Sequence, residues 1–198
     1  DGSLSEIEAI NIPNRNSGYS VRGNVSKRFD VIATTVNLAG GYMQSWSDLL
    51  RESVIMPSQY SLITAELGFN TRITKAVRVD YKAMYNRSMS TIANDTPPAI
   101  NLLKQSADID FIIAQRVICR IGVEHFLNSA IEGGSRNTIF VDASIRFKHK
   151  RMEYSVEARN ILNNSMFMNA SNSNSMDYVY SYSLRPASVI FKVKFSFR

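Results

Sequence analysis

The chain has 198 residues, and its 23 Lys and Arg residues exceed its 17 Asp and Glu residues to give a net charge of +6. This length suits one domain or one barrel and excludes a large multidomain enzyme. Charged residues make up only 20% of the chain and hydrophobic residues 44%, so the sequence is neither a charged tail nor a disordered segment. The single cysteine, Cys119, excludes an internal disulfide, and no stretch is apolar enough to predict a transmembrane helix.

The sequence pattern divides the chain into two regions, residues 1–18 and residues 19–198. Residues 1–18 are polar and irregular and include Pro13, which predicts an irregular external loop segment. Residues 19–198 consist of repeated runs in which apolar and polar residues alternate, and this pattern predicts an array of antiparallel β-hairpins. The weaker runs cover residues 19–25, 32–42, 63–69, 103–111 and 117–123.

The strongest runs place apolar residues on one face of an extended segment and polar residues on the other. The apolar positions are Val77, Val79, Tyr81, Ala83 and Tyr85; Ile139, Val141, Ala143, Ile145 and Phe147; Met152, Tyr154, Val156 and Ala158; and Val189, Phe191, Val193, Phe195 and Phe197. With the weaker runs they predict an all-β chain of about nine strands and no helix.

The length of the runs, the spacing of the loops and the aromatic residues indicate a transmembrane barrel. Several runs extend for about 10 residues, which is what a tilted strand needs to cross a membrane. Expected short turns at 27–30, 73–76, 112–116 and 149–150 alternate with expected long loops, as in outer-membrane barrels. The long loops are expected at 47–57, 90–99, 129–136 and 163–176.

Aromatic residues are expected to form two girdles at the two membrane interfaces. At the long-loop ends these residues are Tyr42, Trp46, Tyr60, Tyr85, Tyr178, Tyr180 and Tyr182, and at the short-turn ends they are Phe29, Phe69, Phe111, Phe147, Phe195 and Phe197. We therefore expect an antiparallel up-and-down transmembrane β-barrel whose apolar face meets lipid and whose polar face lines the lumen. Because single-chain bacterial barrels have an even number of strands, about nine strands predict a part of a larger barrel. A complete small outer-membrane barrel with a structural or adhesive role and a soluble all-β binding module remain alternatives.

The C-terminal third resembles the end of TonB-dependent outer-membrane receptors and their relatives in the outer-membrane β-barrel family. The specific parts are Asn160-Ile161-Leu162-Asn163 and Leu184-Arg185-Pro186, the latter just before a final strand with alternating aromatic residues. The remainder of the chain, from residue 19 onward, is similar to this family only in its repeated β-hairpin pattern. The family commonly ends on an aromatic residue, whereas here Phe197 is penultimate and Arg198 is last.

The resemblance implies a barrel of about 22 strands with a plugged lumen. It also implies uptake of a nutrient ligand, energised by a periplasmic protein that binds near the N-terminus of the whole receptor. This chain matches only the last strands, so its expected partners are outer-membrane lipid, the remainder of the barrel and the plug domain. The expected location is the outer membrane of a Gram-negative bacterium.

Candidate chemical sites have little support in the sequence. His125 lies beside Glu124, but no metal-binding or nucleophile motif accompanies it, and we expect no catalytic, cofactor or metal site. His149 is expected in a solvated basic turn, and Cys119 is expected to be a small buried apolar side chain. The basic residues are interleaved with acidic ones along the strands, which does not favour nucleic-acid binding. The segment 163–176 is expected to be a ligand-binding external loop or a disordered connection. A change of phase at Pro186 predicts a β-bulge.

Overall fold

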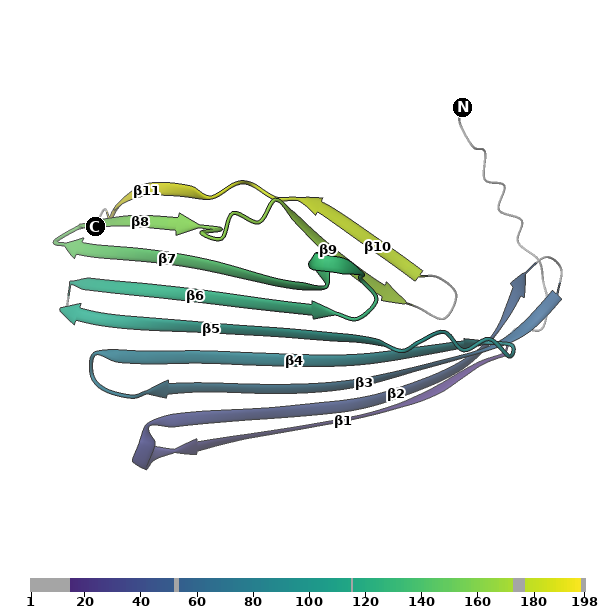
Figure 1. The fold of residues 1–198 in the computed structure, drawn as a ribbon. Coiled ribbons are helices and arrows are strands. Elements are labelled where there is room, and N and C mark those ends of the chain that lie inside the picture. Colours follow the sequence, from purple (N-terminus) through teal and green to yellow (C-terminus); the bar gives the residue numbers. More distant parts are fainter. Residues whose placement is uncertain (1–14, 52–53, 115, 173–176, 197–198) are drawn as a thin grey trace.

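The structure of the protein is a computed structural model that describes residues 15–51, 54–114, 116–172 and 177–196. Within these ranges the chain forms eleven strands and two short 3-10 helices (Figure 1). In chain order they are β1 (Asn16–Phe29), η1 (Asp30–Ile32), β2 (Thr34–Arg51), β3 (Val54–Arg72), β4 (Val77–Ile92), β5 (Ile100–Ala114), β6 (Val117–Asn128), η2 (Gly133–Arg136), β7 (Asn137–His149), β8 (Met152–Arg159), β9 (Met166–Asn172), β10 (Asp177–Ser183) and β11 (Ser188–Phe195).

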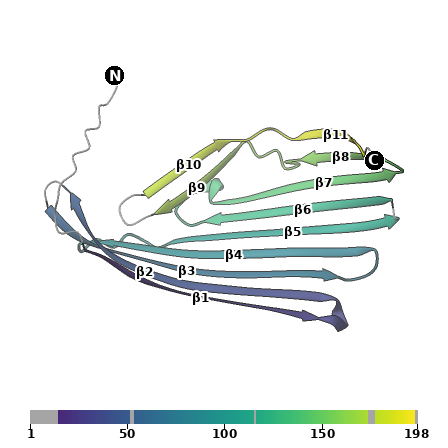
Figure 2. The ribbon, with the colours of Figure 1, turned by 180° about the vertical axis from the view of Figure 1, so that it is seen from behind.

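Nine of these strands form one antiparallel up-and-down sheet in the order β1-β2-β3-β4-β5-β6-β7-β8-β11. The predicted all-β chain with about nine strands is therefore confirmed for this sheet. The sheet is curved but not closed, and β1 and β11 lie at opposite edges in both views (Figures 1 and 2). Strands β9 and β10 pair only with each other and form a separate hairpin.

The register confirms that the alternating residues sort onto two faces of this sheet. Val79 lies opposite Ile109, which lies opposite Ile121, and that residue lies opposite Ala143. The neighbouring row, one residue away on each of these strands, contains Asp80, Asp108, Gly122 and Asp142. We call the first side the apolar face and the second the polar face.

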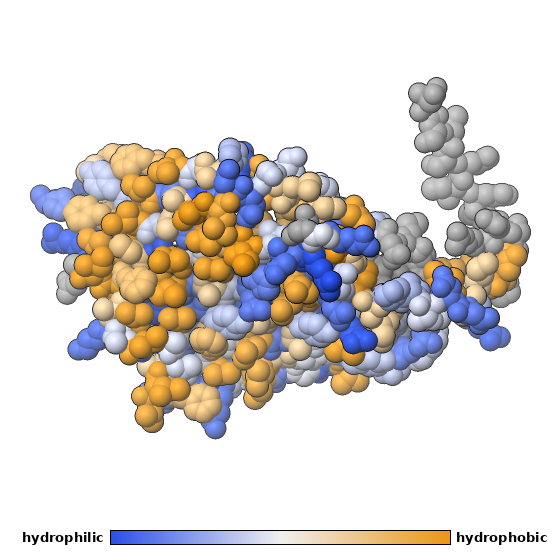
Figure 3. All heavy atoms as spheres, viewed as in Figure 1, coloured by the Kyte–Doolittle hydropathy of each residue, from blue (hydrophilic) through white to orange (hydrophobic). Residues whose placement is uncertain are grey.

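The apolar face is accessible rather than buried in a core. Val156 is 39% exposed, Phe195 54% and Phe191 64%, whereas a sandwich would cover such residues with a second sheet. The β9–β10 hairpin does not cover them, because its contacts are with the polar face. In the space-filling view, hydrophobic residues gather over the left half of the molecule (Figure 3). Within the described ranges, no helix has the length and hydropathy needed to cross a membrane.

Two expected long loops are largely strand. Strand β2 continues to Arg51 and β3 begins at Val54, so most of the segment 47–57 belongs to the sheet. The segment 163–176 contains all of β9. Its Asn and Ser residues have low strand propensity, but pairing with β10 satisfies their backbone groups and outweighs that propensity. The loops expected at 90–99 and 129–136 are present. The first starts three residues later than expected, at residue 93, and the second starts at the expected residue.

The structure also changes the expected boundaries at the two ends of the array. Strand β1 begins at Asn16, inside the segment expected to be irregular, and residues 1–14 lie outside the described part. At Pro186 the change of phase is not a bulge within one strand. The chain leaves the hairpin after Ser183 and joins the main sheet at Ser188, so the two phases belong to two different sheets.

The aromatic residues follow the expected girdles only in part. Phe29, Phe111, Phe147 and Phe195 lie on the apolar face near the short turns, and Tyr42 and Trp46 lie on it near the other end. Tyr60 lies on the polar face, because it is opposite Ser45 and Ser90. Tyr178, Tyr180 and Tyr182 lie on β10, outside the main sheet, and Phe197 lies outside the described residues.

Candidate functional site

Charged side chains on the polar face form pairs across neighbouring strands. Arg120 on β6 lies directly opposite Asp110 on β5, and its Nε and Nη2 atoms donate to the two carboxylate oxygens at 2.6 and 2.9 Å. Asp110 is only 6% exposed, so this two-point contact neutralises a nearly buried carboxylate. Lys82 and Glu66 form a looser pair at 3.6 Å between β4 and β3.

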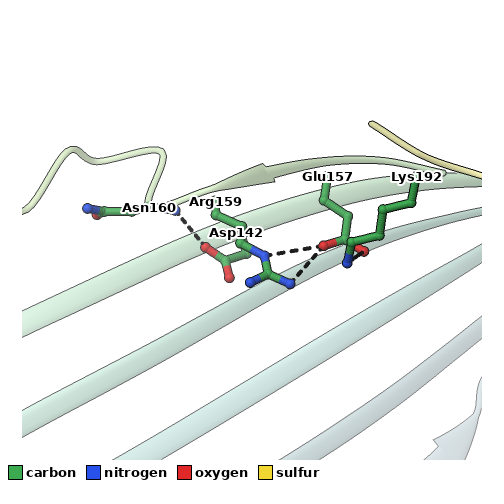
Figure 4. Close-up of polar contacts among 5 residues, drawn as sticks. All are labelled: Asp142, Glu157, Arg159, Asn160 and Lys192. Atoms are coloured by element: carbon green, nitrogen blue, oxygen red, sulfur yellow. Dashed lines mark hydrogen bonds and ion pairs between the residues drawn. The ribbon is translucent and has the colours of Figure 1, made fainter. Parts of the chain in front are cut away.

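A second group of charges joins β8 to the edge strand β11 (Figure 4). Glu157 accepts from Lys192 Nζ at 2.6 Å and from Arg159 Nη2 at 2.8 Å. Nearby, the carboxylate of Asp142 accepts the backbone N–H of Asn160 at 2.8 Å. These contacts place both signs of charge on the polar face of the main sheet, which suits contact with water and polar solutes rather than with hydrocarbon.

The turn after β8 brings together the two motifs that carry the family resemblance. Asn160 has a left-handed backbone, with φ of 50°, and its side-chain amide donates to the carbonyl oxygens of Asn164 and Arg185, both at 2.8 Å. Its side-chain oxygen accepts the Asn164 N–H at 3.0 Å. Asn163 accepts the backbone N–H of Ala187 at 2.9 Å. This turn, residues 160–164, therefore fixes the point where the chain leaves the main sheet and later rejoins it. We call it the asparagine turn.

From this base the β9–β10 hairpin extends across the polar face. Phe167 on β9 makes edge contacts with Phe126 on β6 and Phe140 on β7. The ring centroids are 5.0 and 6.0 Å from that of Phe167. The side-chain amide of Asn128, at the end of β6, donates to Asn169 Oδ1 at 2.8 Å and to the Ala170 carbonyl oxygen at 2.7 Å. Asn128 is 4% exposed, so its amide is held by the hairpin rather than by solvent.

Two hollows lie on the polar face, which is therefore the concave one. The first, of about 540 Å³, is lined by Arg120, Glu124, Asp142, Glu157, Arg159 and, from the base of the hairpin, Leu184 and Arg185. The second, of about 590 Å³, lies over the first strands and is lined by Asn24, Asn37, Glu66, Asp80 and Lys82. Both combine acids, bases and neutral polar groups, and this polar face is the candidate functional site.

The residues weighed as chemical sites from the sequence lie elsewhere. His125 is on the apolar face, where its Nε2 atom lies 2.5 Å from Asn137 Oδ1. Cys119 is on the same face, opposite Phe111 and Ile145, and is half-buried rather than fully buried as expected, because no second layer covers this face. The ring of His149 stacks beside Phe147 at the short-turn end. Among the described residues, no group of His, Cys, Asp and Glu is arranged to hold a metal ion.

Sequence reasoning missed Asn128 and the asparagine turn as contact residues. A short apolar run in a polar stretch, Met166-Phe167-Met168, was a usable signal for a segment that packs against another part of the protein. For Asn128 the sequence offers no signal, because its partners come from β9, 41 and 42 positions away.

The fold and the site define an open, antiparallel, all-β sheet with one accessible apolar face and one concave, charged face. No family model matches the chain, and neither a curated protein nor a solved structure matches it.

Proposed function

We propose that this chain is part of the wall of a TonB-dependent-type transport barrel in the outer membrane of a Gram-negative bacterium. In this proposal the apolar face contacts acyl chains, and the polar face lines the path of a nutrient ligand. The observation that carries the proposal is the accessible apolar face of a single-layer sheet whose other face is charged and hollowed. In water such a face would be covered, whereas in a barrel wall lipid covers it.

The direction of the edge strands supports a larger barrel over a complete small one. An even number of antiparallel pairings separates β1 from β11, so the two edge strands run in the same direction. Joining them would produce a parallel pair, whereas bacterial single-chain barrels are antiparallel throughout. An odd number of further strands from the rest of the protein restores antiparallel closure.

The stagger of the strands also fits a barrel wall. Successive direct partners lead from Phe29, at the short-turn end of β1, to Val189, near the opposite end of β11. The strands are therefore oblique to the direction of the hydrogen bonds across the sheet. Closing a sheet into a barrel requires such a stagger, because barrel strands are tilted from the barrel axis.

The TonB-dependent part of the proposal rests on the resemblance of Asn160–Asn163 and Leu184–Pro186, which meet at one turn in the structure. A plug domain and contact with a periplasmic energising protein would belong to the remainder of the protein. The reading frame upstream of Asp1 tests this part, and we expect it to encode a plug domain. A reading frame without one would leave a membrane wall of another kind.

Cysteine labelling tests the assignment of the faces. In a Cys119→Ser background, single cysteines replace Val141 and Val156 on the apolar face and Ser144 and Ser155 on the polar face of the same two strands, β7 and β8. In lipid vesicles we expect the cysteines at 144 and 155 to react with a charged maleimide. Those at 141 and 156 should resist it and should be quenched by nitroxide lipids when labelled beforehand. Equal reactivity of all four would exclude contact of the apolar face with lipid.

A further inference from the structure

The short turns of the main sheet lie along one edge. Strands β1, β3, β5 and β7 end there, and β2, β4, β6 and β8 begin there, as the left side of Figure 1 shows. Strand β11 also ends at this edge. Residues far apart in the sequence are therefore placed in one line by the topology.

Five exposed basic residues mark this edge, and we call them the cationic edge: Arg72, Lys75, Arg116, Lys150 and Arg151. Within the described part of the chain, no side-chain hydrogen bond or ion pair engages any of the five. The nearby carboxylates are associated with other basic residues. Asp30 accepts from Arg28 at 2.7 Å, and Glu153 lies directly opposite both Lys148 and Lys194.

The opposite edge is balanced by comparison. Among the described side chains there, Asp48, Asp95 and Glu132 offset Arg15, Arg136 and Arg185. The positive excess of the chain, +6 overall, is therefore concentrated at the short turns.

The cationic edge adjoins the apolar face through a line of phenylalanines. Phe29, Phe111, Phe147 and Phe195 lie on that face at the short-turn ends of their strands. Lys27 already contacts this line, with its Nζ 5.3 Å from the centre of the Phe29 ring. Figure 3 shows hydrophilic residues at the left margin, beyond the hydrophobic ones. Long basic side chains at such a boundary can lay their stems on apolar surface and extend their charges to headgroups.

We propose that the cationic edge binds the phosphate groups of anionic phospholipids in the membrane leaflet that surrounds the short turns. The inference rests on the proposed function, because it requires the apolar face to contact acyl chains. The five charges are spread from β3 to β8 and follow the phenylalanine line, rather than converging on one pocket. A continuous layer of headgroups fits that arrangement better than a compact acidic protein does.

A vesicle-binding experiment with the full chain tests this inference and separates it from the proposed function. Vesicles of phosphatidylcholine alone are compared with vesicles of equal parts phosphatidylcholine and phosphatidylglycerol. Trp46, the only tryptophan, lies on the apolar face, so a blue shift of its fluorescence reports insertion in either vesicle. We expect insertion in both and tighter binding to the anionic vesicles, with the preference lost at high salt.

The edge variant combines Lys75→Gln, Arg116→Gln and Arg151→Gln. The matched control combines Arg15→Gln, Arg22→Gln and Arg136→Gln, three exposed arginines away from this edge. Each basic residue near an anionic surface strengthens binding about fivefold, so the edge variant should lose about 100-fold in preference for the anionic vesicles. The control should keep most of it.

A preference that survives in the edge variant, or falls equally in both variants, would overturn the inference while the Trp46 shift keeps the proposed function intact. Absence of the Trp46 shift in both vesicles would remove the proposed function and this inference with it. An edge variant that loses binding to soluble polyglutamate but keeps the lipid preference would assign the edge to an acidic protein instead.

Discussion

The side-chain amide of Asn160 donates a hydrogen bond to the carbonyl oxygen of Arg185 at 2.8 Å, across 25 positions of sequence. This contact closes the base of the β9–β10 hairpin, at the point where the chain leaves the main sheet. The two ends of the hairpin are held together at the point where it begins to cross the polar face. The same asparagine also accepts from and donates to Asn164 within its own turn.

Replacing Asn160 should loosen this base. Asn160→Ala removes three side-chain hydrogen bonds and places alanine in a left-handed backbone, so we expect the free energy of unfolding to fall by about 2–3 kcal/mol. Asn160→Gly should cost less, because glycine tolerates that backbone. Urea unfolding in detergent micelles, followed by Trp46 fluorescence, measures the change. Asn24→Ala on the polar face of β1 is the control. An equal loss of unfolding free energy in that variant would argue against a special role for the asparagine turn.

Asn128 should hold the body of the hairpin on the wall. Asn128→Ala removes both hydrogen bonds to β9 and leaves the base intact, so chymotrypsin should cut faster at Tyr178, Tyr180 and Tyr182. The site of cleavage is read by mass spectrometry. Asn86→Ala, in the same cross-strand row but two strands away, should leave the cleavage rate unchanged. Unchanged cleavage in the Asn128 variant would show that the phenylalanine contacts suffice.

The pairing of Asp110 with Arg120 should matter more than the neighbouring carboxylate. Asp110→Asn weakens a two-point contact at a nearly buried site and should lower the free energy of unfolding by about 1–3 kcal/mol. Asp108→Asn should change it by less than about 0.5 kcal/mol, because among the described residues Asp108 has no ion pair. Urea titrations of both variants make the comparison, and equal losses would contradict it.

Charge on the two faces should have different costs for membrane folding. Val79→Arg and Val141→Arg place a cation on the apolar face, and each should weaken folding into vesicles by about 2–4 kcal/mol near the bilayer midplane. Lys82→Gln and Arg146→Gln on the polar face should have small effects. Folding yield at a series of urea concentrations provides the measurement. If the two pairs of variants behaved alike, the assignment of faces to lipid and lumen would be wrong.

The sequence alone was sufficient to predict the local pattern of the main sheet. Val77, Val79, Tyr81, Ala83 and Tyr85 share a face because successive side chains of any extended strand point to opposite sides. This alternation is a property of neighbouring residues, so no knowledge of partners was needed. The short turn expected at 73–76 has these bounds in the structure, and the one expected at 149–150 lies one residue later, at 150–151, because His149 still belongs to β7.

Only the tertiary structure decided what depends on partners distant in sequence. Segment β9 is a strand despite its Asn and Ser residues, because it pairs with β10. The phase change at Pro186 marks the connection between two sheets, and Asn160 donates a hydrogen bond to the Arg185 carbonyl oxygen. The tertiary structure also placed the basic residues of three turns, β3–β4, β5–β6 and β7–β8, along one edge. Strand register, side-chain contacts across the sheet and the location of charge arise from non-local pairing, and an alternating pattern within one strand carries no information about which strand lies beside it.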